Sequence, residues 1–341
     1  MEFNKILLLA QNALGDVILT TGFAKAVREQ FPYSRLAFLC APFAAELCHL
    51  SFFDDMIPYT KGMPLLPVIR RLWRFDVALC LDFKYRSAVI PFLARVPVRA
   101  GIAHKRRLFM THYVDRNPNH EKMYFAEHLA DIVERAIGLK IEGDLSRLYV
   151  ADATPQDKLA VDNKMQNCRG EGIRVAVAPF SSSTMKDWPI ERYKAFMETL
   201  TQRYKIRFYL IGGATEAKKS IPPFDENVVD LRGCFKITET AELLRRMDYF
   251  VGNCSAPLHI ATAVNLPCLA FYGPGSVAKW APRHKCITLS HPQSCTPCDA
   301  VGYGKPCNFN NVCIQSITMN EALDGFEQLV RRYPAAIRNE Y

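Results

Sequence analysis

Serine hydroxyls and a lysine ammonium gather in one loop of the sequence, APFSSSTMKDWP at residues 178–189. Ser182 and Ser183 can donate hydrogen bonds, and Lys186 supplies a positive charge shortly before Pro189, which opens a helix. Donors of this kind at a helix entry suit the charge and geometry of a diphosphate. The alternative interpretation is a serine-rich helix cap with a lysine on the surface.

A second candidate anion site lies in YFVGNCSAPLHIATAV, residues 249–264, where an apolar strand passes through a short turn into a helix. Asn253 and Ser255 belong to the turn, and His259 follows in the first turn of the helix. Backbone amides at a helix start carry partial positive charge and attract anions. His259 could therefore face a phosphate, or it could be a histidine whose hydrogen bonds are satisfied inside the protein.

Two further loops carry single acidic residues at strand ends. In IGGATE, residues 211–216, Gly213 permits close approach of a ligand, and Glu216 could accept hydrogen bonds from a ribose diol. In AQNALGD, residues 10–16, Asp16 stands at a helix start, either as an N-cap or as a carboxylate that takes a proton from a substrate hydroxyl. This loop lacks G-x-G-x-x-G, which argues against a dinucleotide-dependent dehydrogenase.

Positive charge is concentrated in the first half of the chain. The net charge is +9, and residues 61–110 contain eleven lysines and arginines against two acids. Such a basic region attracts anionic lipid or a phosphorylated glycan, and the alternative is a solvated face. Aromatic residues interleave too sparsely there to bind single strands, so we expect no nucleic-acid partner.

Four of the twelve cysteines fall in one segment, at Cys295, Cys298, Cys307 and Cys313. Their spacing, C-x2-C-x8-C-x5-C, indicates a knuckle that holds a structural zinc or iron ion. Four reduced thiols are the alternative. In either case the segment would brace a loop and take no part in catalysis.

Alternating strands and helices must position these loops. Short apolar runs such as residues 5–10, 173–180 and 206–213 predict buried parallel strands, and helical spacing lies between them. The alternation predicts a doubly wound α/β sheet in each half, with a polar, irregular stretch at 152–172 between the halves. Ligands of such sheets bind beyond the carboxyl ends of the strands, so we expect the site in a cleft between two sheets.

Six motifs in chain order resemble glycosyltransferase family 9, whose members include ADP-heptose:lipopolysaccharide heptosyltransferases. The motifs are NALGDVILTT, SSSTMKDWP, IGGATE, DLRGCFKITETAELLRRMDYFVGN, PLHIATAVNLPCLAFYGPGS and WAP. The resemblance implies the GT-B fold, two Rossmann-like α/β domains with a central cleft, the first binding the acceptor and the second the nucleotide sugar. We place these domains at residues 1–165 and 166–325, and we expect a C-terminal helix at 326–341 that packs back toward the first domain.

The resemblance also implies an inverting transfer with direct displacement at the anomeric carbon of the sugar. Asp16 matches the general base, Lys186 the lysine on the donor phosphates, and Glu216 the acid near the nucleotide ribose. The implied donor-binding residues are Ser182, Ser183, Lys186, Gly213, Glu216, Asn253, Cys254, Ser255, Ala256 and His259. The basic residues expected to meet a phosphorylated, membrane-embedded acceptor are Lys84, Arg86, Arg99, Lys105 and Arg106.

The sequence departs from the family at the donor turn. Cys254 stands where the family has an aspartate that reaches the hydroxyls of the sugar, and Ala256 replaces a glycine. A neutral thiol is a poor hydrogen-bond acceptor, whereas Lys186, Ser255 and His259 can still bind phosphate.

The favoured function is transfer of heptose from ADP-heptose to a lipopolysaccharide core or a related lipid-linked, phosphorylated glycan. The alternatives are a transferase of the same fold that uses another nucleotide sugar or a protein acceptor, and a non-catalytic relative that binds nucleotide sugars. Because no D-x-D motif is evident, we expect catalysis to need no cofactor. The sequence has no run of about 18 apolar residues and no signal-peptide pattern, which predicts a cytoplasmic protein with peripheral contact to the anionic inner membrane.

Overall fold

The apolar strands of the first half pair in parallel to form one six-stranded sheet in the order β3-β2-β1-β4-β5-β6. Leu7 at the centre of β1 is in register with Ala37 of β2 and Ala78 of β4. The computed structural model describes residues 3–168, 171–298 and 307–335. The strands of this sheet are β1 (Lys5–Ala10), β2 (Arg35–Cys40), β3 (Asp55–Pro58), β4 (Val77–Cys80), β5 (Val98–Ile102) and β6 (His112–Val114).

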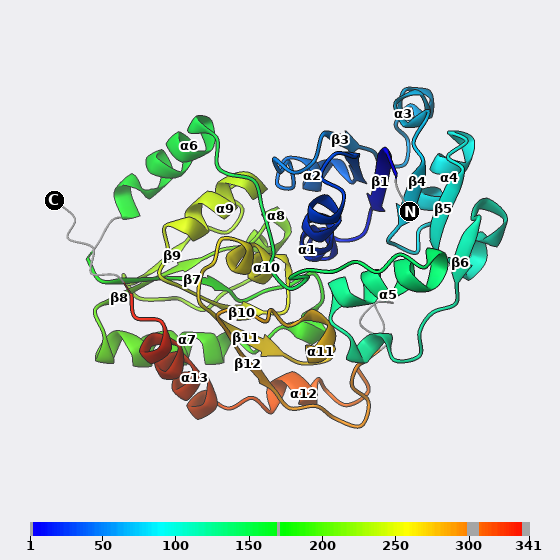
Figure 1. The fold of residues 1–341 in the computed structure, drawn as a ribbon. Helices are drawn as coiled ribbons and strands as arrows, with labels where there is room; N and C mark the ends of the chain where they lie inside the picture. Colours follow the sequence, from blue (N-terminus) through cyan, green and yellow to red (C-terminus); the bar gives the residue numbers. More distant parts are fainter. Residues whose placement is uncertain (1–2, 169–170, 299–306, 336–341) are drawn as a thin grey trace. The chain divides into compact units, whose positions relative to one another are not determined.

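Helices cover both faces of the first sheet (Figure 1). Residues Leu7 and Leu9 of β1 pack in one core cluster with Val68 and Ile90, so α3 and α4 cover the face to which these side chains point. Helices α1 and α5 pack against each other, and α5 also contacts β5 and β6. The elements are α1 (Leu14–Gln30), α2 (Pro42–Ala45), α3 (Leu65–Leu72), α4 (Tyr85–Leu93), α5 (Phe125–Ile137) and two 3₁₀ turns, η1 (His104–Phe109) and η2 (His120–Lys122).

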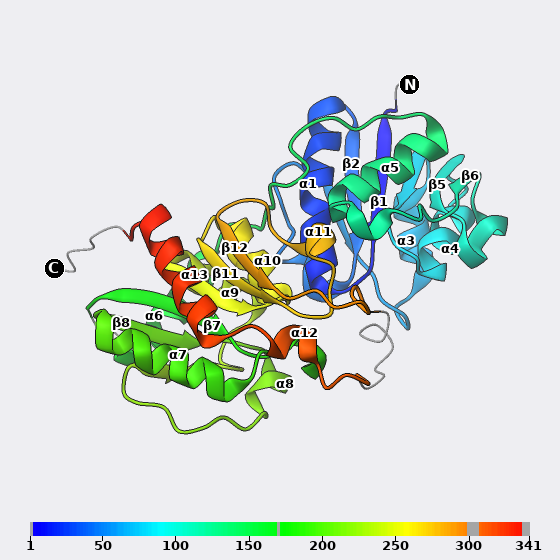
Figure 2. The ribbon, with the colours of Figure 1, turned by 90° about the horizontal axis from the view of Figure 1, so that it is seen from below.

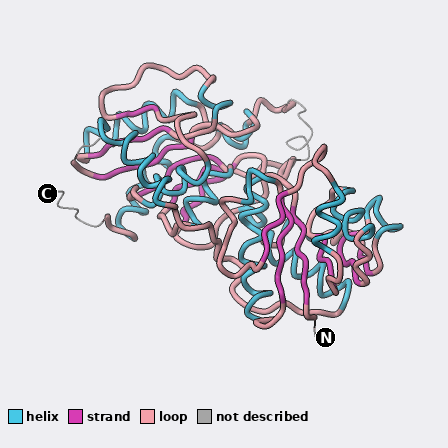
Figure 3. The backbone as a smooth tube through the Cα atoms, turned by 90° about the horizontal axis from the view of Figure 1, so that it is seen from above, coloured by secondary structure: helices cyan, strands magenta, loops and turns pink. Residues whose placement is uncertain are grey.

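The second half repeats the architecture with the strand order β12-β11-β10-β7-β8-β9, again in parallel. Figure 3 shows strands and helices in alternation along both halves. The strands are β7 (Ile173–Ala178), β8 (Ile206–Leu210), β9 (Val228–Asp230), β10 (Tyr249–Asn253), β11 (Cys268–Tyr272) and β12 (Cys286–Ser290). The helices are α6 (Pro155–Met165), α7 (Ile190–Arg203), α8 (Ala214–Ala217), α9 (Ile237–Arg245), α10 (Ala256–Ala263), α11 (Val277–Trp280), α12 (Val312–Gln315) and α13 (Met319–Arg332), with 3₁₀ turns η3 (Gln166–Cys168) and η4 (Thr184–Lys186).

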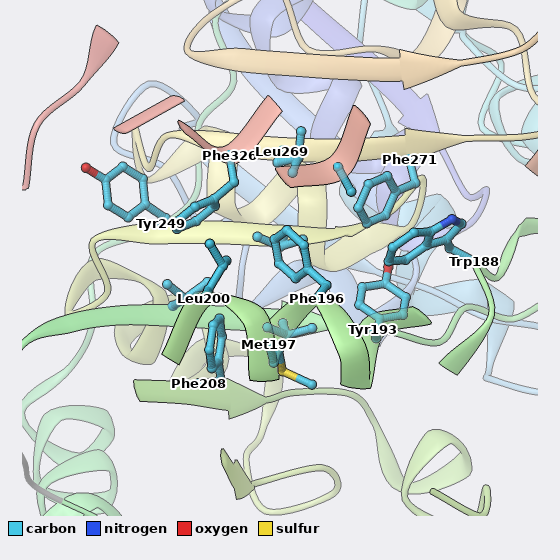
Figure 4. Packing of buried hydrophobic residues seen from close by; sticks show 14 of the residues in the cluster. Trp188, Tyr193, Phe196, Met197, Leu200, Phe208, Tyr249, Leu269, Phe271 and Phe326 are labelled. Atoms are coloured by element: carbon cyan, nitrogen blue, oxygen red, sulfur yellow. The ribbon is translucent and has the colours of Figure 1, made fainter. Parts of the chain in front are cut away.

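One aromatic-rich cluster forms the core beneath α7 and α13. Figure 4 shows Phe196 of α7, Phe326 of α13 and Phe271 of β11 in this cluster. The ring of Trp188 stacks on that of Phe271, with centroids 4.5 Å apart, and it meets the ring of Tyr193 edge-on at 5.0 Å. Burial of such large rings is the main favourable term in holding the α7 layer on the sheet.

The observed doubly wound sheets confirm the predicted α/β class, but two local features differ from the prediction. The stretch predicted to be irregular contains α6, whose start is fixed by a capping box in which Thr154 and Asp157 bond each other's backbone amides. The chain divides into two compact units, Met1–Ala151 and Asp152–Tyr341, and this division falls upstream of the boundary that we placed at residue 165. Helix α6 belongs to the second unit because Arg246, which follows α9, pairs with its Asp162 at 2.7 Å.

The C-terminal helix also belongs to the second unit. It begins at Met319, and its Phe326 and Leu329 are fully buried in the core cluster on the second sheet. The apolar side chains of this helix are therefore used on the sheet of its own unit, and its packing toward the first domain stays a prediction. Residues 336–341 of the predicted segment lie outside the described residues.

A glycine in α1 lets the last segment of the first unit cross that helix closely. A Cβ on Gly22 would lie 2.5 Å from the carbonyl oxygen of Leu145 and 2.6 Å from that of Arg147. The neighbouring Thr21 hydroxyl accepts a hydrogen bond from the backbone N–H of Tyr149 at 2.9 Å. The segment is thus held on α1 by backbone contacts that leave no room for a methyl group.

We predict that Gly22→Ala destabilises the protein by about 1–3 kcal/mol, since the backbone must shift to admit the methyl group. Urea unfolding followed by circular dichroism measures the change. Gly275→Ala is the matched control, because its methyl group would meet only a carbon of Trp280 at 3.9 Å. Equal stability of the Gly22 and Gly275 variants would contradict this account of the crossing.

Candidate active site

Most of the candidate residues lie near the point where each sheet reverses its winding direction. In the first unit that point is between β1 and β4, and in the second it is between β7 and β10. Loops that leave two adjacent strands at such a point turn to opposite faces and leave room for a ligand beyond the carboxyl ends. The loops after β1 and β4 therefore carry candidate residues of the first unit, and the loops after β7 and β10 carry candidate residues of the second.

Asp16 lies in the first turn of α1, directly after the β1 loop. The N-cap of α1 is Ala13, so the N-cap role that was the alternative for Asp16 does not apply. The side chain of Asp16 is half-buried, and the charge of its carboxylate acts on Lys84, where it favours the protonated ammonium. Burial is the main effect on the pKa of Lys84 and lowers it, Arg86 lowers it further, and Asp82 and Asp16 oppose both.

A buried carboxylate joins the loops after β1 and β4. Asp82 accepts hydrogen bonds from the backbone N–H of Gln11 at 2.7 Å, from that of Lys84 at 2.8 Å and from the Ser87 hydroxyl at 2.8 Å. The Arg106 guanidinium lies 3.7 Å from it, and both side chains are almost wholly buried. Asp82 thereby fixes the start of α4 and the basic residues that follow β4.

Lys84 and Arg86 from the predicted acceptor set converge on Gln11. Lys84 Nζ donates to the backbone carbonyl of Gln11, and Arg86 Nε donates to its side-chain oxygen. The Gln11 Nε2 group is buried and forms no hydrogen bond within the described residues. Two cations, an unsatisfied donor and the Asp16 carboxylate thus lie around one strand end.

Two arginines of the predicted acceptor set have structural contacts instead. Arg106 is 1% exposed and donates to the backbone carbonyls of Lys84 at 3.0 Å and Ile102 at 2.8 Å, so it cannot reach a ligand. Arg99 lies near the start of β5, away from the carboxyl ends, and donates to the carbonyls of Phe109 and Val96. We therefore drop both from the acceptor set, whereas Lys105 is exposed on η1 and stays in it.

A fully buried amide organises the loops of the second unit. Asn253 accepts hydrogen bonds from the Trp188 backbone N–H at 3.1 Å and the Tyr193 hydroxyl at 3.0 Å, and it donates to the Pro179 carbonyl at 2.8 Å. Its side chain is 0% exposed. Asn253 therefore clamps the β7 loop against β10 and is not available to a donor molecule, contrary to our prediction.

Asp187 is the second organiser of the β7 loop. It accepts hydrogen bonds from the backbone N–H and the hydroxyl of Ser181, each at 2.8 Å, and pairs with Lys219 at 3.1 Å. The Lys219 ammonium and the Arg232 guanidinium both lie over the ring of Phe180, at 4.8 and 5.5 Å from its centroid. We did not predict roles for Lys219 and Arg232, because only the fold brings α8 and β9 beside the β7 loop.

The remaining predicted donor residues of this loop stay accessible. Ser182 is exposed, and Ser183 and Lys186 are half-buried, while Ser181 is spent on Asp187. Gly213 is the exposed N-cap of α8, and its N–H donates at 3.0 Å to Glu216, whose carboxylate closes a capping box. Part of the Glu216 carboxylate thus caps its own helix.

The turn that opens α10 brings Lys186 and His259 together. Cys254, Ser255 and Ala256 are half-buried in this turn, and no side chain caps the helix. His259 is 3% exposed, and its Nδ1 forms no hydrogen bond in the described part of the chain. Burial, and to a smaller extent the nearby Lys186 ammonium, lowers the pKa of His259 to about 4. The imidazole is therefore neutral at pH 7, and Lys186 supplies the positive charge beside it.

The four cysteines of the predicted knuckle do not form a metal site in the residues that the structure describes. Burial raises the pKa of the Cys313 thiol, with smaller contributions from Cys307 and Cys295. Backbone N–H groups of Phe309 and Asn311 donate to the Cys307 sulfur at 3.4 and 3.3 Å. Yet no three of the described cysteine, histidine or acidic side chains are grouped closely enough to hold a metal ion.

Comparison with known proteins supports the sequence resemblance. Residues 68–304 match the model of glycosyltransferase family 9 (heptosyltransferase). Lipooligosaccharide heptosyltransferase 2 of Haemophilus influenzae is 26% identical over 294 residues, which cover 80% of this chain and 84% of that protein.

Among the helices of the described residues, none has the length and apolar character needed to cross a membrane.

Solved structures share the fold over almost the whole chain. A glycosyltransferase family 9 protein from Veillonella parvula has a TM-score of 0.79 at 18% identity, covering 97% of this chain and 98% of that one. The ADP-heptose heptosyltransferase II of Escherichia coli has a TM-score of 0.75 at 18% identity, covering 97% of this chain and 100% of that one. The two doubly wound sheets and these likenesses confirm the GT-B fold class. The chain belongs to glycosyltransferase family 9, and it is a glycosyltransferase.

We predict that acid destabilises the wild-type protein more than a His259→Asn variant. The unfolded chain protonates His259 near pH 6.5, whereas the folded protein does so only near pH 4. Between these values unfolding takes up a proton, so stability is lost as the pH falls from about 6.5 to 4, by about 3 kcal/mol in total.

Urea unfolding at pH 7, 5.5 and 4.5 measures this difference in slope. His112→Asn is the control, since His112 is exposed on β6. Parallel loss of stability in wild type and the His259 variant would show that this imidazole does not carry the effect.

Proposed function

We propose that the protein transfers heptose from ADP-heptose to a phosphorylated, lipid-linked glycan acceptor such as a lipopolysaccharide core. The observation that carries the proposal is that the charge of Lys186 acts on a buried, neutral His259 near the uncapped start of α10. A cation, an imidazole and helix amides at one strand end form a preorganised site for a diphosphate. Two of the named relatives are heptosyltransferases, and the name of one includes ADP-heptose, which supports this donor.

The proposed chemistry is a direct displacement with inversion at the anomeric carbon. Asp16 takes the proton of the acceptor hydroxyl as its oxygen forms the new bond to that carbon. The bond from the anomeric carbon to the diphosphate breaks at the same time, and the leaving diphosphate gains negative charge. Lys186 and the amides at the start of α10 stabilise this charge, so the reaction needs no metal or other cofactor.

The proposed division of labour follows the two units. The first unit binds the acceptor through Lys84, Arg86 and Lys105, which offer positive charge to phosphate groups. The second binds the nucleotide sugar through Ser182, Ser183, Lys186, Gly213, Glu216, Cys254, Ser255 and Ala256, which remain at least partly exposed, with the buried His259 beside Lys186. Structural zinc or iron is not part of the proposal, because the described cysteines bring no three ligands together.

Cys254 and Ala256 are compatible with a second donor substrate, a nucleotide sugar other than ADP-heptose. Both are half-buried in the turn that opens α10, where the family has an aspartate and a glycine. A neutral thiol offers the sugar hydroxyls a poor acceptor, so a different sugar on the same kind of diphosphate is the competing proposal.

We predict that Asp16→Asn abolishes transfer and leaves ADP binding intact, because Asp16 acts on the acceptor. Lys186→Gln should instead weaken ADP binding by about tenfold to a hundredfold, the loss expected for one hydrogen bond to a charged group. Calorimetry with ADP and a single-turnover transfer assay separate the two effects. Undiminished turnover of the Asp16 variant would remove Asp16 from the mechanism.

We predict that calorimetry with a panel of nucleotide sugars ranks ADP-heptose first. ADP-linked sugars should bind more tightly than UDP-linked ones, and Cys254→Asp should change the ranking among sugars and leave the affinity for ADP itself unchanged. Binding of UDP-linked sugars alone would reject heptose transfer from ADP-heptose.

A further inference from the structure

Exposed hydrophobic side chains are concentrated in one part of the first unit. Of the fourteen exposed large hydrophobic side chains in the described residues, nine lie between Met63 and Tyr113. These nine are Met63, Leu66, Trp73, Phe83, Tyr85, Phe92, Leu93, Leu108 and Tyr113. Scattered single exposures need no explanation, but a gathering of this kind indicates an interaction surface.

Most of these side chains belong to α3, α4 and η1 or to the residues that flank them. Helix α4 packs against α3 on one side and against η1 on the other, and α3 and α4 lie next to each other in Figures 1 and 2. The ring of Phe109 on η1 contacts those of Tyr85 and Phe92 on α4, at 5.1 and 5.2 Å. Leu108, beside Phe109, is 81% exposed. Exposed apolar side chains thus lie on α4, on η1 and on the neighbouring α3.

Positive charge predominates around these exposed apolar residues, although the exposed Asp115 pairs with Arg107 of η1 at 3.2 Å. Between residues 59 and 114 the acids are Asp76 and Asp82. Asp82 is buried, and Asp76 is half-buried, its carboxylate accepting backbone N–H bonds from Asn4 and Lys5. The exposed cations that form no ion pair within the described residues include Arg70, Arg74, Arg95 and Lys105.

Two of these cations occupy backbone conformations that suit glycine better. Arg74 follows the end of α3 with φ of 68°, and Arg95 follows the end of α4 with φ of 56°. A left-handed residue just past a helix end is usually glycine, because a side chain there costs energy. The chain thus holds an arginine after each helix at some conformational cost.

We propose that these residues form a docking face for an anionic phospholipid bilayer. The docking face consists of Leu66, Arg70, Trp73, Arg74, Phe92, Leu93, Arg95, Lys105 and Leu108. Aromatic rings favour the headgroup level, leucines favour the hydrocarbon below it, and each cation near an anionic membrane surface contributes about 1 kcal/mol. A second copy of the chain fits less well, because two such faces would bring like charges together.

This inference rests on the proposed function in one respect: the enzyme must reach a lipid-anchored acceptor at the membrane surface. The face lies on the elements that follow β3, β4 and β5, so it belongs to the unit with the proposed acceptor residues Lys84 and Arg86. Docking would hold that unit at the surface where the acceptor is embedded.

The test is co-sedimentation of the full chain with vesicles of phosphatidylglycerol and phosphatidylcholine, and with vesicles of phosphatidylcholine alone. We expect binding to the anionic vesicles only, weakening as salt screens the charges. Arg74→Gly with Arg95→Gly should weaken binding about 30-fold, from about 1 kcal/mol for each cation. Since glycine suits both backbone conformations, this variant should fold at least as well as the wild type. Leu108→Ser should weaken binding about tenfold.

Matched controls separate the face from total charge and total apolar surface. Lys158→Ala with Lys205→Ala removes the same charge from exposed positions of the second unit, and Leu159→Ser removes a leucine that is 60% exposed on α6. Binding that falls equally in the controls, or that is equal on neutral vesicles, would overturn the docking face. A vesicle-free dimer that Leu108→Ser dissociates would assign the face to self-association instead.

The outcome is independent of the proposed chemistry, because vesicle binding requires neither donor nor acceptor. Transfer to a delipidated acceptor should be unchanged in the Arg74 and Arg95 variant. Retained vesicle binding without heptose transfer would reject the proposed function alone, and the reverse result would reject the docking face alone.

Discussion

The donor loops depend on one buried amide, that of Asn253. It lies at the end of β10, and its hydrogen bonds reach the start and the end of the β7 loop and the first turn of α7. Each partner is buried, so removal of the amide would leave donors and an acceptor unsatisfied at about 1–3 kcal/mol apiece. The position of Lys186, which lies within that loop, therefore follows from an interaction that no ligand touches.

The first unit solves the same problem with a carboxylate. Asp82 follows β4, the neighbour of β1, and it receives amide N–H groups from the loops of both strands. A negative charge buried at this depth needs a counter-charge, and Arg106 supplies it from η1. In both halves a buried polar side chain joins two loops at the point where the winding direction of the sheet reverses. Neighbouring residues of these loops remain available to bind ligands.

Much of the fold follows from pattern, whereas the roles of several site residues do not. Continuous apolar runs such as residues 5–10 predict buried parallel strands, and the alternation of strands and helices predicts the doubly wound sheets. The sequence does not distinguish the role of Arg106 from that of Lys105, because both belong to one basic run. Only the η1 turn buries Arg106 and exposes Lys105. Lys219 and Arg232 were missed because their partners, Asp187 and Phe180, are distant in the chain.

His259 and Lys186 together explain why the α10 turn suits an anion. Without a bound anion, the Lys186 ammonium lies close to the His259 imidazole, which stays neutral. The buried Nδ1 of His259 has no hydrogen-bond partner among the described residues. A diphosphate would offset the charge of Lys186 and thereby remove one of the two causes that lower the pKa of His259. Its oxygens would also accept from the helix amides that no side chain caps. The turn thus carries positive charge that an anion would neutralise, and this holds for any sugar that Cys254 and Ala256 accept. Recognition of the diphosphate and recognition of the sugar are therefore separable properties of one loop.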